Sequence, residues 1–169
     1  MTQNHAALDS ALVRRTAEAL ERTGRFGELR RYAQHGACSV YEHSIRVACT
    51  ALKLARRLAP GLNRDALVRG ALLHDYFLYD WHIPDPTRPK HAFYHPRVAL
   101  TNALRDYALS DTETDVILRH MFPLVPIPPR TREGWIVCLA DTWCALGETV
   151  NRRRLAGIAA RLFGPKAPR

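Results

Sequence analysis

Residues 63–75 read NRDALVRGALLHD. Asn63 can cap a helix that runs with an apolar face up to His74 and Asp75. This apolar face consists of Ala66, Leu67, Gly70, Ala71 and Leu73. Burying an unpaired charge costs free energy, so two ionisable residues at the end of a buried helix need partners. The stretch therefore predicts a buried polar cluster that other helices complete.

The segments on either side also follow a helical pattern. Upstream, Ser39 and Glu42 form a capping-box sequence at the start of a helix that ends before Pro60 and Gly61. Further helices are expected over about residues 9–23, 28–34, 96–107, 111–121, 133–146 and 152–163. No alternating apolar and polar run and no hairpin turn signal indicates a strand. The sequence predicts an all-α fold, a single compact bundle of six or seven helices.

Residues 76–94 interrupt the helical pattern. Pro84, Pro86 and Pro89 argue against a continuous helix here. Loops of this length in compact domains are often functional. The aromatic residues of the segment can stack on a substrate ring or cover the core, and the second role is favoured for most of them. They are Tyr76, Phe77, Tyr79, Trp81 and Tyr94.

The composition is that of one globular domain. Of 169 residues, 47% are hydrophobic and 24% charged, which excludes a disordered chain. No stretch approaches the roughly 18 consecutive apolar residues of a membrane span, and the N-terminus lacks the layout of a signal peptide. A cytoplasmic location without a membrane partner is therefore expected. The four cysteines form no Cys-x-x-Cys pair and are expected to be small buried residues.

The net charge of +9 is concentrated near the C-terminus. Residues 149–169 hold six Arg and Lys residues and no Asp or Glu. A basic end of this kind can touch nucleic acid or anionic lipid. A solvated, solubilising end is the favoured interpretation, so a nucleic-acid partner is not expected.

Four more ionisable residues lie in similarly apolar surroundings. His43 lies one turn into the capped helix, His95 follows the proline-rich loop, and His120 closes a helix. Asp141 is the sole carboxylate in WIVCLADTWCAL, residues 135–146. Imidazole and carboxylate are suitable ligands for divalent metals. Cys138 and Cys144 share the face of Asp141, where packing is favoured over metal ligation.

The order of these residues resembles the HD-domain superfamily of metal-dependent phosphohydrolases. The matching segments are VYEHSIRVA (40–48), ALLHD (71–75), HPRVAL (95–100), ILRH (117–120) and CLAD (138–141). The resemblance implies that His43, His74, Asp75 and Asp141 bind a first metal. It also implies that Asp75 bridges to a second metal, which His95 and His120 complete. The two ions would be divalent iron, manganese or zinc.

The resemblance also divides the chain into three parts. Residues 1–38 are expected to be an N-terminal helical segment that packs on the core. Residues 39–148 are expected to be the HD domain with the metal site, and residues 149–169 a basic C-terminal helix and tail. Within the superfamily, residues 95–99 and 139–141 are most similar to small bacterial proteins that cleave dinucleoside polyphosphates.

The residues that would assist the chemistry depart from the family pattern. Leu78 occupies the position where many relatives place a Lys or Glu, and no Glu-Asp pair follows His74-Asp75. Candidate replacement helpers in the loop are Asp80, His82, Lys90 and His91, and exposed loop histidines are the equal alternative for His82 and His91. Asp75 and Arg97 are the predicted catalytic residues. The predicted substrate contacts are Arg97, Lys90, Arg130 and Arg132.

The leading functional hypothesis is a phosphohydrolase for a small nucleotide-like phosphoester or phosphoanhydride. Two metal ions would activate a water and polarise the phosphoryl oxygens. A dinuclear-iron oxygenase of the same fold remains open, because its ligand set is nearly the same. A nucleotide-binding module without turnover also remains open, since the helper at Leu78 is missing. The sequence leaves the oligomeric state, the metal and the leaving-group acid undecided.

Overall fold

The computed structural model describes the backbone of residues 2–35, 38–83 and 90–163, and the side chains of residues 5–34, 38–83 and 90–148. In chain order, the elements are α1 (Thr2–Thr23), the 3-10 helix η1 (Phe26–Arg31), β1 (Ala33–His35), β2 (Cys38–Ser39), α2 (Val40–Leu58), α3 (Arg64–Leu73), α4 (His91–Asp106), α5 (Asp111–Arg119) and α6 (Arg132–Phe163). The described residues form helices and only one short hairpin, so the predicted all-α fold is confirmed.

Four local predictions differ from the structure. Helix α1 begins at Thr2, seven residues ahead of the expected start at residue 9. The turn expected over residues 28–34 is a 3-10 helix followed by β1, which pairs antiparallel with β2. Strands of three and two residues are too short to show an alternating pattern. Helix α4 begins at His91, ahead of the expected start at Pro96, which lies inside the helix. Helix α6 is continuous through residues 147–151, since a single helical glycine costs only about 1 kcal/mol.

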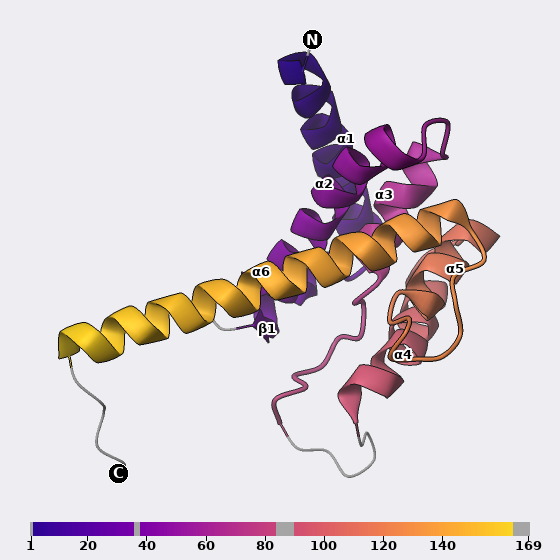
Figure 1. Ribbon diagram of the computed structural model, residues 1–169. Coiled ribbons are helices and arrows are strands. Elements are labelled where there is room, and N and C mark those ends of the chain that lie inside the picture. Colours follow the sequence, from indigo (N-terminus) through magenta and orange to yellow (C-terminus); the bar gives the residue numbers. More distant parts are fainter. Residues whose placement is uncertain (1, 36–37, 84–89, 164–169) are drawn as a thin grey trace.

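Helix α2 lies at the centre of the packing. It contacts α3 and α6, and α3 also contacts α5. Helix α1 packs on α2 and α3. Figure 1 shows α6 crossing in front of the other helices and continuing beyond them toward the C-terminus, so that the expected boundary at residue 148 falls within this helix. None of the described helices is long and apolar enough to cross a membrane.

Local capping fixes where the site-bearing helices begin. The Ser39 side chain accepts a hydrogen bond from the Glu42 amide, and the Glu42 side chain accepts one from the Ser39 amide, as predicted. Asn63 caps α3 through its side chain, also as predicted. A second capping box, formed by Ser110 and Glu113, starts α5. These caps fix the phase of three helices and therefore the direction of the residues they present.

The turn that follows α3 is anchored on both sides. The buried Tyr76 hydroxyl donates to Asp106 (2.7 Å) and accepts from the Arg25 amide (2.9 Å). The side-chain amide of Asn102 donates to the carbonyls of Tyr76 and Phe77 at 3.1 and 3.0 Å. Tyr76 and Phe77 thus belong to the core, and they hold the preceding His74-Asp75 pair in place.

Candidate metal centre

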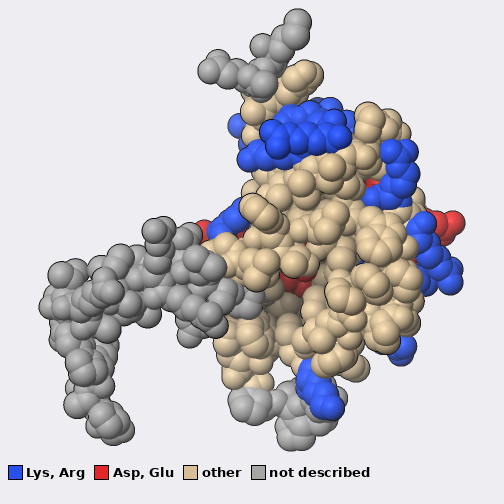
Figure 2. Space-filling view, viewed as in Figure 1, with Lys and Arg blue, Asp and Glu red and all other residues tan. Residues whose placement is uncertain are grey.

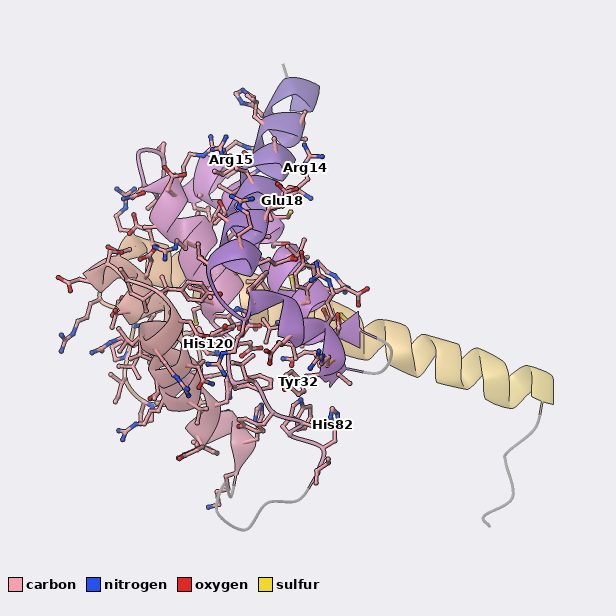
Figure 3. The ribbon with its side chains drawn as sticks, turned by 180° about the vertical axis from the view of Figure 1, so that it is seen from behind. Arg14, Arg15, Glu18, Tyr32, His82 and His120 are labelled. Carbon is pink, nitrogen blue, oxygen red and sulfur yellow. The ribbon has the colours of Figure 1, made fainter. Side chains whose placement is uncertain are left out.

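The structure brings together four histidines and two aspartates from separate helices. His43 comes from α2, His74 and Asp75 follow α3, and His95 comes from α4. His120 follows α5, and Asp141 comes from α6. All except Asp141 are buried, and the Asp141 side chain is only 15% exposed. In Figure 3, His120 lies within the bundle, whereas Arg14, Arg15 and Glu18 lie on the outside of α1.

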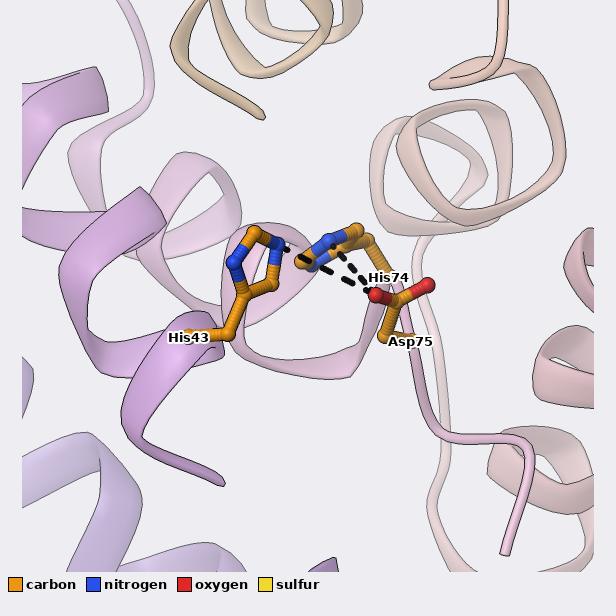
Figure 4. Close-up of side chains that lie close together, drawn as sticks. All are labelled: His43, His74 and Asp75. Atoms are coloured by element: carbon orange, nitrogen blue, oxygen red, sulfur yellow. Dashed lines mark ion pairs between the residues drawn. The ribbon is translucent and has the colours of Figure 1, made fainter. Parts of the chain in front are cut away.

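Asp75 occupies the middle of this cluster. Its Oδ2 lies 4.0 Å from His43 Nε2 and 3.4 Å from His74 Nε2 (Figure 4). Its Oδ1 lies 3.1 Å from His95 Nε2 and 3.6 Å from His120 Nε2. Each oxygen of one carboxylate therefore faces a different pair of histidines, which is the arrangement that a bridging ligand between two metal ions requires.

Asp141 completes the first of the two groups. Its Oδ1 lies 3.0 Å from His43 Nε2 and 3.7 Å from His74 Nε2. On the other side, the Nε2 atoms of His95 and His120 lie 2.9 Å apart. One side of Asp75 therefore holds His43, His74 and Asp141. The other side holds His95 and His120, for which Asp75 is the nearby carboxylate.

Backbone carbonyls determine which nitrogen each histidine presents. The Nδ1 atoms of His74, His95 and His120 bond to the carbonyls of residues 71, 91 and 117, at 2.7, 3.1 and 2.9 Å. A carbonyl only accepts, so Nδ1 carries a proton, and a ring that has given up its Nε2 proton presents the Nε2 lone pair to the cluster. This use of the second ring nitrogen is usual for histidines that bind metals.

The donor set fits divalent metal ions. Three sets of ligand atoms each lie within 4.8 Å of one another: His43, His74 and Asp75; His74, His120 and Asp141; and Asp75, His95 and His120. Within the described part of the chain, His74 Nε2 and Asp75 Oδ1 are buried without a hydrogen-bond partner. Buried polar atoms are normally satisfied, and a shared cation would satisfy both. Imidazole and carboxylate together suit zinc, iron and manganese.

Burial and neighbouring charges shift the pKa values of the cluster, and for several residues the two effects have opposite signs. Burial alone would lower the pKa of His43, but its hydrogen bonds with Asp141 and Glu148 raise this pKa to about 9. Burial and the neighbouring His74 lower the pKa of His120 to about 3. Burial would raise the pKa of Asp75, yet His74 and His95 hold it well below its usual value. The carboxylates are thus ionised and available to a cation, and metal binding at His43 displaces a proton.

A family model of the HD domain matches residues 40–146. The chain belongs to the HD-domain family. HD domains bind divalent metals and are generally phosphohydrolases, which supports metal-dependent hydrolase activity here. No curated protein and no solved structure matches the chain significantly.

This HD domain places two further side chains at the cluster that sequence reasoning missed. Glu148 accepts a hydrogen bond from His43 Nδ1 (3.1 Å), and its side chain is 5% exposed. Gln34, on β1, donates from Nε2 to Asp75 Oδ2 (2.8 Å). Glu148 follows Asp141 by seven residues, two helical turns, and this spacing was a usable signal. No sequence signal marks Gln34, because its strand has only three residues.

The predicted substrate contacts of this HD domain lie elsewhere. Arg97 follows His95 by two residues, about 200° around α4, and lines a separate cavity with Leu78. The Arg130 amide donates to Asp115, and the Arg132 side chain donates to the carbonyl of residue 60. Lys90 is exposed before the first turn of α4. The structure brings none of the four to the metal cluster.

The other candidates of the sequence analysis are also placed. His82 and Asp80 are exposed and bond to each other at 3.1 Å. His91 lines the cavity beside the cluster, where burial lowers its pKa to about 4. The thiols of Cys138 and Cys144 donate to the Phe122 carbonyl and the Thr50 hydroxyl, in keeping with the packing role that was favoured.

A cavity of about 470 Å³ opens directly onto the cluster. Five of the six candidate ligands contribute to its floor: His43, Asp75, His95, His120 and Asp141. Its walls are mainly apolar and include Trp81, Met121, Phe122, Pro123, Leu124 and Leu146. In Figure 2, an acidic side chain shows at the bottom of a hollow whose border is free of Lys and Arg among the described residues.

Replacing Glu148 with glutamine is expected to weaken metal binding about 10-fold. The carboxylate orients His43 and increases the basicity of its ring, and loss of such a contact usually lowers metal affinity 10- to 100-fold. Competition with a chromophoric chelator measures the affinity. Arg46→Gln is the matched control, because it removes the 3.0 Å ion pair of Glu148 but leaves Glu148 on His43. Equal losses in the two variants would contradict the role given to the His43 contact.

Proposed function

We propose that this HD domain is a phosphohydrolase that cleaves an ester or anhydride bond of a small phosphorylated substrate at two divalent metal ions. His43, His74, Asp75 and Asp141 hold the first ion, and Asp75, His95 and His120 hold the second. Asp75 carries the proposal, because each of its oxygens faces a separate pair of histidine Nε2 atoms. Family membership supports the hydrolase class.

The residues of the chain orient and complete this site. When bound, the two metal ions supply Lewis-acid activation of water and of the phosphoryl group. The carbonyl contacts of three histidine Nδ1 atoms fix the ring orientations. Gln34 lines the cavity and holds Asp75 through Nε2, while its buried Oε1 has no hydrogen-bond partner in the described part of the chain. That oxygen is placed to accept a hydrogen bond from a water or from the substrate.

The four basic residues expected to bind a nucleotide do not lie at the metal cluster. Binding several phosphates calls for basic side chains around the site. Lys90, Arg97, Arg130 and Arg132 were expected to supply them, and all four lie outside the cavity that opens onto the cluster. A phosphoryl group is therefore expected to bind at the cluster, attached to an organic group other than a nucleotide.

Metal content with activity tests the proposed function. The full chain, loaded with manganese, zinc or iron, is expected to bind about two ions and to release phosphate from a simple phosphomonoester. His95→Ala is expected to retain about one ion, because the four ligands of the first site remain. His82→Ala, which changes an exposed histidine, is the control and keeps both ions.

Three results would contradict the proposed function or the separation of its two metal sites. Uptake of fewer than about half an ion per chain with all three metals would exclude the dinuclear site. Two bound irons with substrate-dependent oxygen consumption and no phosphate release would favour the oxygenase alternative. Loss of both ions in His95→Ala would show that the two groups of ligands do not bind separately.

A further inference from the structure

We propose that the substrate is a phosphate monoester of an apolar alcohol, aliphatic or aromatic, whose organic group lies against the apolar wall of the cavity. This inference rests on the proposed function and names the class of its substrate. It departs from the nucleotide expected from the sequence. Three observations support it: the composition of the wall, the exposure of the rim and the distribution of charge.

The apolar wall is built as a fixed surface. Its main part is the segment 121–124 between α5 and α6. The Cys138 thiol donates to the Phe122 carbonyl at 3.0 Å, and the Phe122 ring contacts the Trp135 ring edge-on at 5.3 Å. The Val125 amide donates to the Met121 carbonyl at 2.9 Å. A wall held at several points presents a preformed apolar surface to a ligand.

The rim of the cavity is also apolar, and its leucines are exposed to solvent. Leu124 is 47% exposed and Leu146 is 60% exposed, although both line the cavity. These two large aliphatic side chains, one between α5 and α6 and one on α6, remain hydrated until a ligand covers them. An apolar group that covers them is stabilised in proportion to the apolar area it removes from water.

The charges of the described lining suit one phosphoryl group. None of the described residues that line the cavity is Lys or Arg, so in this part of the lining the cations of the metal centre would hold the phosphoryl group. A second or third phosphate would face the apolar wall, where burying an unpaired charge costs free energy.

Apart from Gln34 Oε1 beside Asp75, few polar groups of the described lining remain for a sugar or a base. The Thr142 hydroxyl already donates to the carbonyl of residue 138 at 2.9 Å, and His91 Nδ1 bonds to the Tyr79 hydroxyl at 2.8 Å. The Trp81 ring already contacts the rings of His82 and His91, with centroids 3.9 and 5.0 Å away. A polar substituent would therefore lose more hydrogen bonds with water than it could form with this wall.

A homologous series of substrates tests the inference. The metal-loaded full chain is assayed with n-alkyl phosphates from methyl to hexyl, with 1-naphthyl phosphate, and with adenosine mono- and diphosphate. Each methylene that enters the cavity is expected to raise kcat/KM about two- to fourfold. Hexyl phosphate is then expected to exceed methyl phosphate by at least about 30-fold and to exceed both nucleotides. Equal rates for methyl and hexyl phosphate, or preference for the diphosphate, would overturn the inference and leave the proposed function standing.

Substitution at the rim provides a second test with a matched control. Leu124→Glu places a charge where the alkyl chain would lie, and is expected to lower kcat/KM for hexyl phosphate at least about 10-fold with little change for methyl phosphate. Leu104→Glu makes the same change at an exposed leucine of α4, 56% exposed, outside the cavity, and is expected to change neither. Equal effects of Leu124→Glu on the two substrates would count against the apolar wall as the binding surface.

A binding measurement separates this inference from the proposed function. Alkyl phosphonates carry the same chain on a carbon–phosphorus bond that this reaction does not cleave. Calorimetry on the metal-loaded protein is expected to show affinity rising from methyl- to hexylphosphonate by at least about 30-fold. Such a rise without turnover of any ester would overturn hydrolysis but support the ligand class. Affinity independent of chain length would overturn the ligand class, whatever the activity.

Discussion

Asp75→Asn is expected to lower kcat/KM for a phosphomonoester by at least about 10³-fold. The carboxylate supplies one oxygen to each group of histidines, so the variant weakens both metal sites at once. Loss of contacts to a metal ligand typically costs 10- to 100-fold, and loss of a shared ligand exceeds this. Phosphate release at saturating metal measures the effect, and metal content measured in parallel is expected to fall well below two ions per chain.

Asp65→Asn is the matched control for this substitution. Asp65 is exposed in the first turn of α3, the helix that carries His74 and Asp75 toward the centre. It is expected to keep metal content and activity within about twofold of the parent chain. A variant of Asp75 that retained two ions and more than a tenth of the activity would contradict the bridging role.

Metal binding is expected to raise the melting temperature by about 8–16 °C. A ligand present at 1,000 times its dissociation constant stabilises the native state by about 4 kcal/mol, and each kcal/mol shifts the transition of a chain of this size by about 2–4 °C. The site exists only when the helices are packed, so the ion binds the native state in preference to the unfolded chain. Thermal unfolding with and without chelator, followed by circular dichroism, measures the shift.

The Asp75→Asn chain serves as the control for the thermal shift. Without the shared carboxylate, its transition is expected to move by less than about 3 °C on addition of the same metal. A comparable shift in this variant would mean that the metal stabilises the fold from another place. The absence of a shift in the parent chain at saturating metal would contradict specific binding to the native cluster.

Features with a local cause could be predicted from the sequence. The caps at Ser39 and Asn63 depend on residues three positions apart, and both were confirmed. The apolar face before His74 predicted a buried helix, and its seven buried residues agree. The ordered motif from His43 to Asp141 predicted the family, which the match to residues 40–146 confirms.

Features decided by tertiary geometry could not be predicted in this way. Glu148 reaches His43 across 105 residues, and Gln34 reaches Asp75 from a strand too short to leave a pattern. The arginines were assigned by their distance along the chain, whereas helix phase directs Arg97 into a different cavity. The apolar wall at 121–124 could not be predicted either, because only the packing of Phe122 on Trp135 shows which surface this segment forms.

The distribution of the ligands over five helices also constrains how this protein is assembled. His43 and Asp141 are 98 residues apart, and their rings and carboxylates meet only after α6 has docked on α2. No contiguous fragment that ends before α6 contains both carboxylates of the first group. During synthesis, Asp141 must therefore leave the ribosome before the metal site can form. Metal binding is then a late event that follows the docking of α6 on α2.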